Sequence, residues 1–126
     1  MQPLVDLPQR HMRTLLALLA AHTPQAEVWA FGSRINGTAH EGSDLDIVLR
    51  NPADLKRSSP GFFELKEALQ ESALPILTEL HDWAHLPVSF HTEIARRYVV
   101  LQGPLEGEPN PSEATQERLE RLGYAA

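Results

Sequence analysis

Apolar residues recur along the chain in two patterns, one helical and one extended. Helical spacing predicts helices over residues 7–22, 61–72 and 88–97. Short apolar runs bounded by glycine, proline or polar residues predict strands over 27–31, 44–49 and 76–83, and an extended segment over 98–102. This alternation predicts an α/β or α+β fold in which helices cover one face of a small sheet.

The last part of the chain has a different composition. From Gly103 onward it is rich in proline, glycine and glutamate, which is typical of a linker over residues 103–111. Ser112 is placed to cap a short solvated helix. We therefore expect a main domain over residues 1–102 and a linker with a short helix over 103–126. That helix is either a loosely held appendage or a docking element that contacts a partner through Leu119, Leu122 and Tyr124.

The size and charge of the chain narrow the possible function classes. A length of 126 residues fits one domain with a core of its own. The net charge of −6 disfavours direct binding to nucleic acid, because lysine and arginine are needed to neutralise phosphates. The chain has no cysteine, so no disulfide is expected. No apolar run approaches the ~18 residues of a membrane span, and we expect a cytoplasmic protein without membrane contact.

Two carboxylates lie at the start of a predicted strand, within the segment VWAFGSRINGTAHEGSDLDIVL (residues 28–49). Asp44 and Asp46 are two residues apart, so on a strand their side chains share one face, opposite Leu45 and Ile47. Adjacent carboxylates raise each other's pKa unless a cation lies between them. Oxygen ligands on a strand suit Mg²⁺, which also takes oxygens from a phosphate.

The turn before this strand is suited to phosphate. Gly32 lets a ligand approach the backbone closely, and Ser33 adds a hydroxyl at the start of a helical turn. Arg34 is placed to reach a phosphate oxygen, and Ser43 either caps the turn or contacts a phosphate. Each feature alone is more often structural. Together, at a spacing of ten residues, the Gly-Ser turn and the Asp-x-Asp pair favour phosphoryl or nucleotidyl transfer.

A known superfamily has the same arrangement of residues. The polymerase-β-like nucleotidyltransferases have Gly-Ser, ten residues and then Asp-x-Asp, which this chain resembles in GSRINGTAHEGSDLD. The small size and the lead-in VWAFGSR resemble the minimal nucleotidyltransferases, or MNT proteins. The resemblance covers about residues 10–102. It implies an α+β fold with a small mixed β-sheet and helices packed on one face.

The resemblance also implies three carboxylates that hold two Mg²⁺ ions, with the triphosphate at the Gly-Ser turn. The first two carboxylates map onto Asp44 and Asp46. The third maps onto Glu79, because the chain has TELHDW where the family has a pattern like VDLVDW. Glutamate keeps the charge of the usual aspartate and can act as a metal ligand or general base. Asp82 is the second candidate, although strand alternation points it to the other face.

An enzyme that transfers AMP from ATP to an acceptor hydroxyl is the activity that the resemblance implies. MNT proteins resemble the antitoxin of a pair whose other member is a small helical HEPN protein, and the acceptor is then a tyrosine of that partner. Such a pair implies a hetero-oligomer. One alternative is an inactive nucleotide-binding antitoxin that acts by complex formation, which the glutamate at position 79 favours. Another is an aminoglycoside-type enzyme, but such enzymes carry acceptor-binding helices that this chain lacks.

The histidines and tryptophans have simpler interpretations. His81, His85 and His91 are expected at the surface rather than in a zinc site, with His81 close to the active cleft. Trp29 and Trp83 flank two predicted strands, so we expect them in the core rather than as platforms for base stacking.

Overall fold

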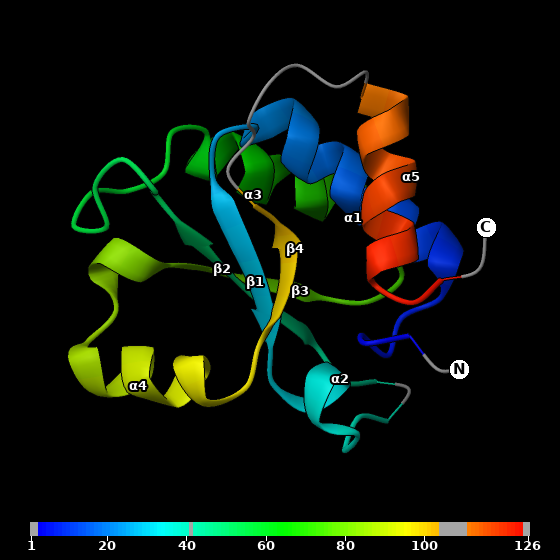
Figure 1. Cartoon of the computed structure of the whole chain (residues 1–126), viewed down its shortest axis with the longest axis horizontal. Helices are drawn as coiled ribbons and strands as arrows, with labels where there is room; N and C mark the ends of the chain where they lie inside the picture. Colours follow the sequence, from blue (N-terminus) through cyan, green and yellow to red (C-terminus); the bar gives the residue numbers. More distant parts are fainter. Residues whose placement is uncertain (1–2, 41, 104–110, 125–126) are drawn as a thin grey trace.

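The computed structural model of the chain describes residues 3–40, 42–103 and 111–124. The helices and strands that the apolar pattern predicts are present, with ends shifted by one or two residues (Figure 1). In chain order they are α1 (Gln9–His22), β1 (Glu27–Phe31), α2 (Ser33–Asn36), β2 (Leu45–Arg50), α3 (Phe62–Glu71), β3 (Thr78–Asp82), the 3₁₀ turn η1 (Trp83–His85), α4 (Val88–Arg96), β4 (Val99–Gln102) and α5 (Pro111–Arg121). Within these ranges, none of the helices has the length and apolarity needed to cross a bilayer.

The four strands form one mixed sheet in the order β3-β2-β1-β4. β1 pairs antiparallel with both β2 and β4, whereas β2 and β3 run parallel. A parallel pair needs a crossover connection, and α3 provides it between β2 and β3. The α+β class with a small mixed sheet is therefore confirmed.

The main core lies on the face of the sheet that α1, α3 and α5 cover (Figure 1). α1 contributes Met12, Leu15, Leu16 and Leu19, which recur at helical spacing and are fully buried. They meet the alternate side chains Leu45, Ile47 and Leu49 of β2. Each fully buried leucine or isoleucine stabilises the fold by roughly 1.5–3 kcal/mol.

A smaller apolar cluster lies on the opposite face of the sheet, where α4 packs. Its buried members are Trp29, Val48 and Ile94. The helices therefore cover one face extensively, as expected, and α4 adds partial cover to the other. This second layer leaves part of its face free of helix, and the carboxylates lie on that face.

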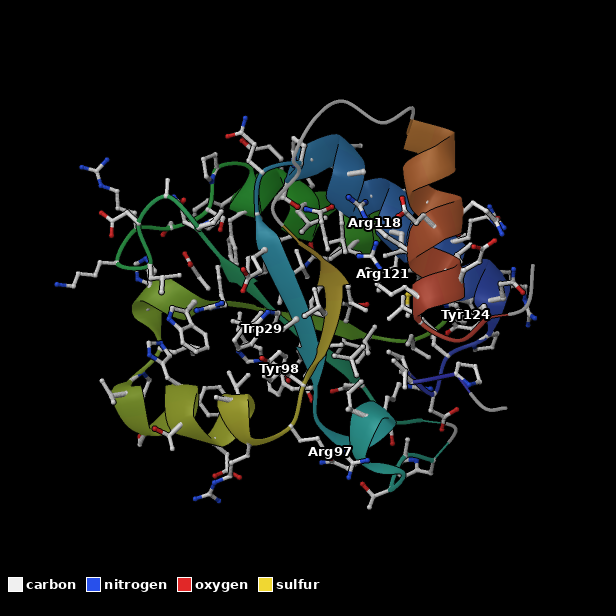
Figure 2. All side chains as sticks on the ribbon, viewed as in Figure 1. Trp29, Arg97, Tyr98, Arg118, Arg121 and Tyr124 are labelled. Atoms are coloured by element: carbon white, nitrogen blue, oxygen red, sulfur yellow. The ribbon has the colours of Figure 1, made fainter. Side chains whose placement is uncertain are left out.

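Aromatic stacking extends the smaller cluster toward the surface (Figure 2). Trp29 stacks on Tyr98 with ring centroids 3.8 Å apart and meets Trp83 edge-on. The Arg50 guanidinium lies over both tryptophan rings and forms an ion pair with Glu27. The prediction that Trp29 belongs to the core is confirmed, because only 8% of it is exposed.

α5 packs on α1 and is part of the main core. Leu119, Leu122 and Tyr124 are buried there, and the Tyr124 hydroxyl donates a hydrogen bond to the carbonyl of Leu7. The expectation of a loosely held appendage is therefore wrong for this helix, because its apolar side chains pack into the chain's own core. Most of the expected linker, residues 104–110, lies outside the described residues.

Candidate functional site

The Gly32-Ser33 turn lies directly against the Asp46 carboxylate. Gly32 has φ 88°, a left-handed conformation that strains other residues, and it precedes the single turn of α2. A Cβ added at Gly32 would lie 2.4 Å from Asp46 Oδ2. Glycine is thus required twice at this position, for its backbone angle and for the close approach of the carboxylate.

Strand pairing brings Asp46 and Glu79 together. In the parallel register of β2 and β3, Asp46 is the partner of Glu79, and Val48 is the partner of His81. Alternation along each strand therefore places Asp46, Glu79 and His81 on one face. Leu45, Ile47 and Leu80 point into the main core on the other face.

These three side chains converge on a small volume. His81 Nε2 lies 3.9 Å from Asp46 Oδ1 and 3.9 Å from Glu79 Oε2. One ligand atom from each of Asp46, Glu79 and His81 lies within 4.8 Å of the other two. The donor set of two carboxylates and one imidazole fits a divalent cation.

The accumulation of negative charge raises the pKa of Asp46 to about 6. Burial contributes most, followed by a hydrogen bond and charge repulsion from Glu79 and by repulsion from Asp44. A divalent cation bound here would reverse this effect, because it stabilises the ionised carboxylates. Ionisation of all these carboxylates together is therefore unfavourable unless a cation lies between them.

His81 is held by aromatic neighbours. Its ring lies 5.5 Å from that of Phe31 and 5.8 Å from that of Phe90, between centroids. Burial lowers the pKa of His81, and the opposing effect of the Glu79 charge is smaller. A lowered pKa favours neutral imidazole, the form that binds metals.

Comparison with known proteins identifies the family. Residues 12–119 match the model of the nucleotidyltransferase domain. The chain belongs to this nucleotidyltransferase family. It is 37% identical over 100 residues to the probable protein adenylyltransferase MntA of Haemophilus influenzae, a match that covers 78% of this chain and 84% of the relative.

Solved structures agree on the fold. A toxin–antitoxin crystal structure with AMP-PNP matches with a TM-score of 0.59 and 20% identity, over 91% of this chain and 86% of that chain. A toxin–antitoxin MntA-HpeT structure with a tyrosine-to-alanine mutation matches with a TM-score of 0.58 and 20% identity, over 91% of this chain and 85% of that chain. At this identity the likeness supports the fold of the nucleotidyltransferase and nothing finer.

Asp44 and Ser43 lie in the turn before β2 of the nucleotidyltransferase. Asp44 is close enough for its charge to raise the pKa of Asp46, but it is not among the three residues whose ligand atoms converge. Ser43 is buried, and its hydroxyl accepts a hydrogen bond from the backbone N–H of His40 at 2.9 Å. Ser43 thus stabilises the turn that positions Asp44.

The expectation for Arg34 needs correction. Its side chain is buried, and its guanidinium donates two hydrogen bonds to the Ser43 carbonyl and one to the Asp6 carbonyl, at 2.6–3.0 Å. Those contacts tie α2 to the turn before β2 and to the N-terminal segment. Arg34 therefore braces the site rather than presenting its charge to a phosphate. The carbonyls that it contacts are distant in sequence, so no local pattern revealed them.

The second candidate for the third acid, Asp82, does not lie in the cluster. It ends β3, accepts a hydrogen bond from Ala84 N at 3.4 Å and lies 3.6 Å from His85 Nε2. Its role is to cap η1. His81 is the residue whose place in the site was underestimated, although its spacing of two from Glu79 on one strand is a usable signal.

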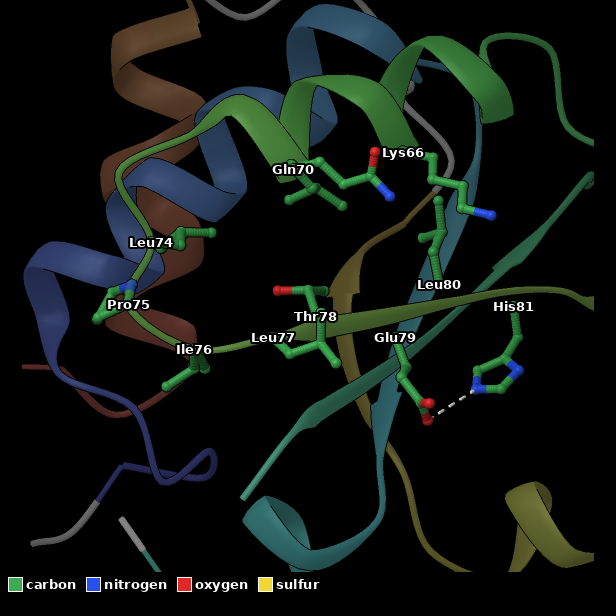
Figure 3. A pocket seen from close by; sticks show the side chains of 11 residues that line it. Lys66, Gln70, Leu74, Pro75, Ile76, Leu77, Thr78, Glu79, Leu80 and His81 are labelled. Atoms are coloured by element: carbon green, nitrogen blue, oxygen red, sulfur yellow. Dashed lines mark ion pairs between the residues drawn. The ribbon is translucent and has the colours of Figure 1, made fainter. Parts of the chain in front are cut away.

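A cavity of about 580 Å³ borders the site, and Glu79 and His81 are among the residues that line it. It lies between α3 and β3, where Lys66 and Gln70 face the strand (Figure 3). Thr78 and Leu80 point toward α3, whereas the Glu79 and His81 side chains point to the other side of β3. The side chains of Glu79 and His81 therefore leave β3 on the side away from α3.

Proposed function

We propose that this nucleotidyltransferase transfers AMP from ATP to a tyrosine hydroxyl of a HEPN-family partner and acts in that way as an antitoxin. The observation that carries the proposal is the parallel register of Asp46 and Glu79 beside the Gly32 turn. The relative named a probable protein adenylyltransferase supports the class of reaction. The toxin–antitoxin structures of the same fold support the kind of partner.

The residues divide the reaction between them. Gly32 and Ser33 hold the triphosphate at the turn, and Asp44, Asp46 and Glu79 would hold Mg²⁺, which neutralises phosphate charge when bound. The acceptor oxygen forms a bond to the α-phosphorus, and the bond from that phosphorus to the α,β-bridging oxygen breaks. Pyrophosphate leaves with the electron pair of the broken bond.

Glu79 receives the proton of the acceptor hydroxyl. Its side chain is 52% exposed, so an acceptor that arrives from solvent can reach it, whereas the Asp46 side chain is 24% exposed. Glu79 is also the register partner of Asp46, so its carboxylate lies beside a residue that would hold the metal. Asp46 is therefore placed to hold metal, and Glu79 both to share in that metal site and to receive the proton.

The test is transfer of label from α-³²P-ATP to a purified HEPN-family protein, taken from a gene next to that of this chain where such a gene is found. With Mg²⁺, we expect a labelled partner band and, in its mass spectrum, a tyrosine joined to AMP through a single phosphodiester bond. Asp46→Asn should reduce labelling by at least about a hundredfold. Asp54→Asn, which changes an exposed aspartate away from the sheet, should leave it unchanged. An unlabelled partner in a stable complex would refute the transfer reaction.

A second candidate function is an antitoxin that binds nucleotide but acts by complex formation alone. The glutamate at position 79 is the feature that favours it. Glu79→Asp separates the two: reduced labelling indicates a site built around glutamate, whereas labelling that first appears in Glu79→Asp indicates a site that has lost activity. Toxin inhibition measured without ATP then reports the complex alone.

A further inference from the structure

His81 occupies an unusual position for a residue without a role in the proposed chemistry. It lies on the strand next to Asp46 and two residues from Glu79, and its Nε2 atom faces both carboxylates at 3.9 Å. Those distances are too long for hydrogen bonds. The imidazole therefore faces both carboxylates without a hydrogen bond to either of them.

The surroundings of His81 keep its ring in this orientation. Phe31 on β1 and Phe90 on α4 pack against the ring, and Phe31 is also the register partner of Asp46. The ring is 25% exposed at the side chain, so a small ion can reach it although the faces are packed. A donor held by packing is pre-organised for binding, because little rotamer entropy remains to be lost.

We propose that His81 is a direct metal ligand, and that Asp46, Glu79 and His81 form a mixed nitrogen–oxygen site that binds Mn²⁺ or another first-row transition-metal ion through the imidazole in preference to Mg²⁺. One ligand atom from each of the three lies within 4.8 Å of the others, so the ligands already converge. Imidazole suits transition metals, whereas Mg²⁺ prefers oxygen ligands alone. The inference rests on the metal site of the proposed function, but concerns which ion that site selects.

Metal binding tests this inference without any turnover. Tag-free protein is titrated with Mn²⁺, the free ion is followed by electron paramagnetic resonance, and Mg²⁺ affinity is obtained by competition. We expect His81→Gln to weaken Mn²⁺ binding by at least about tenfold, since even outer-shell partners of a metal contribute 10–100-fold. Mg²⁺ affinity should change by less than about twofold.

A matched control and a spectroscopic signature complete the experiment. His85→Gln removes a histidine that faces a different carboxylate, Asp82, and should leave Mn²⁺ affinity unchanged. Pulsed electron paramagnetic resonance of the nucleotide-free Mn²⁺ protein should show ¹⁴N coupling that His81→Gln removes. Circular dichroism and thermal melting verify that each variant is folded.

Each outcome decides the inference. Unchanged Mn²⁺ affinity in His81→Gln would overturn it. Weaker binding in that variant without ¹⁴N coupling in the unchanged protein would also overturn it, because His81 would then only position the carboxylates. If His81-dependent Mn²⁺ binding is found but no AMP is transferred to the partner, the metal site stands and the proposed function fails.

Discussion

At the scale of single residues, burial and neighbouring carboxylates make ionisation of Asp46 unfavourable. Burial and its carboxylate neighbours raise the pKa of Asp46 to about 6, so the native state binds this proton more tightly than the unfolded chain does. The contribution of Asp46 to stability therefore becomes less favourable as the pH rises from about 4 to about 6. In metal-free protein at neutral pH the ionised side chain opposes folding.

Replacing Asp46 by Asn should therefore stabilise the metal-free protein at pH 7.5. We expect a gain of about 1 kcal/mol, after discounting the shift for solvent at this partly exposed side chain. The gain should shrink at pH 4.5, where Asp46 is protonated in the native state. Urea unfolding at both pH values with a chelator present measures it. An equal effect at the two pH values would show that the pKa of Asp46 is not raised in the folded protein.

Gly32 is the second residue whose chemistry follows from its exact surroundings. Gly32→Ala should cost about 1–3 kcal/mol of stability, because φ 88° strains alanine. It should also weaken Mn²⁺ binding, because the new Cβ would meet Asp46 Oδ2 at 2.4 Å. Thermal melting and metal titration measure the two effects.

Gly37→Ala is the matched control for this prediction. Gly37 also has a positive φ, 77°, but its ψ of 13° places it in the left-handed helical region, which strains alanine less than the backbone of Gly32 does, and a Cβ there meets nothing within 4 Å. We expect it to lower stability and to leave metal affinity intact. If both variants bound Mn²⁺ equally well, the close approach of Gly32 to Asp46 would have no functional role.

At the scale of elements, the sequence predicted those features that depend on local pattern. The apolar spacing gave the helices and strands, and the alternation along β2 placed Asp46 on the face opposite Ile47. The contacts that sequence did not predict are between elements. His81 reaches Asp46 through the pairing of β3 with β2, and Arg34 reaches Asp6 across the N-terminal segment.

Arg34 connects α2 to the turn before β2 and to the N-terminal segment, and these connections can be tested by mutation. Arg34→Met keeps much of the side-chain volume but leaves the carbonyls of Ser43 and Asp6 without these hydrogen bonds. We expect a loss of about 3 kcal/mol in unfolding free energy, because bonds to charged donors are strong and the bared carbonyls are costly. Urea denaturation measures it.

The control for Arg34 is an exposed arginine. Arg57→Met removes an exposed ion pair with Asp54 and should change stability by less than about 1 kcal/mol. Nucleotide affinity of Arg34→Met, measured where the variant is fully folded, separates bracing from phosphate binding. If Arg34→Met had unchanged stability but no longer bound ATP, Arg34 would be a phosphate-binding residue and not a structural one.

At the scale of the whole molecule, the chain builds two apolar layers on one sheet and places its chemistry beside the thinner layer. α1, α3 and α5 cover one face of the sheet. The apolar side chains that β2 and β3 bury against these helices fix the register that aligns Asp46 with Glu79. On the other face, α4 leaves the carboxylates accessible while Phe90 packs against His81. Changes in the packing of α1, α3 or α5 should therefore alter the position of the carboxylates through the strands that carry them.

The attachment of α5 can be tested at Tyr124, which is buried while its hydroxyl donates to the Leu7 carbonyl. Tyr124→Phe should cost about 1 kcal/mol. Burial, with a smaller effect of Asp6, raises the pKa of Tyr124 to about 12, so its hydroxyl stabilises the fold fully below pH 10 and less as the pH rises toward 12. The difference between the two proteins should therefore shrink above pH 10. Tyr98→Phe is the control, because this ring is exposed and loss of its hydroxyl should change stability little at any pH. If Tyr124→Phe and Tyr98→Phe melted at the same temperature, the Tyr124 hydroxyl would not contribute to holding α5.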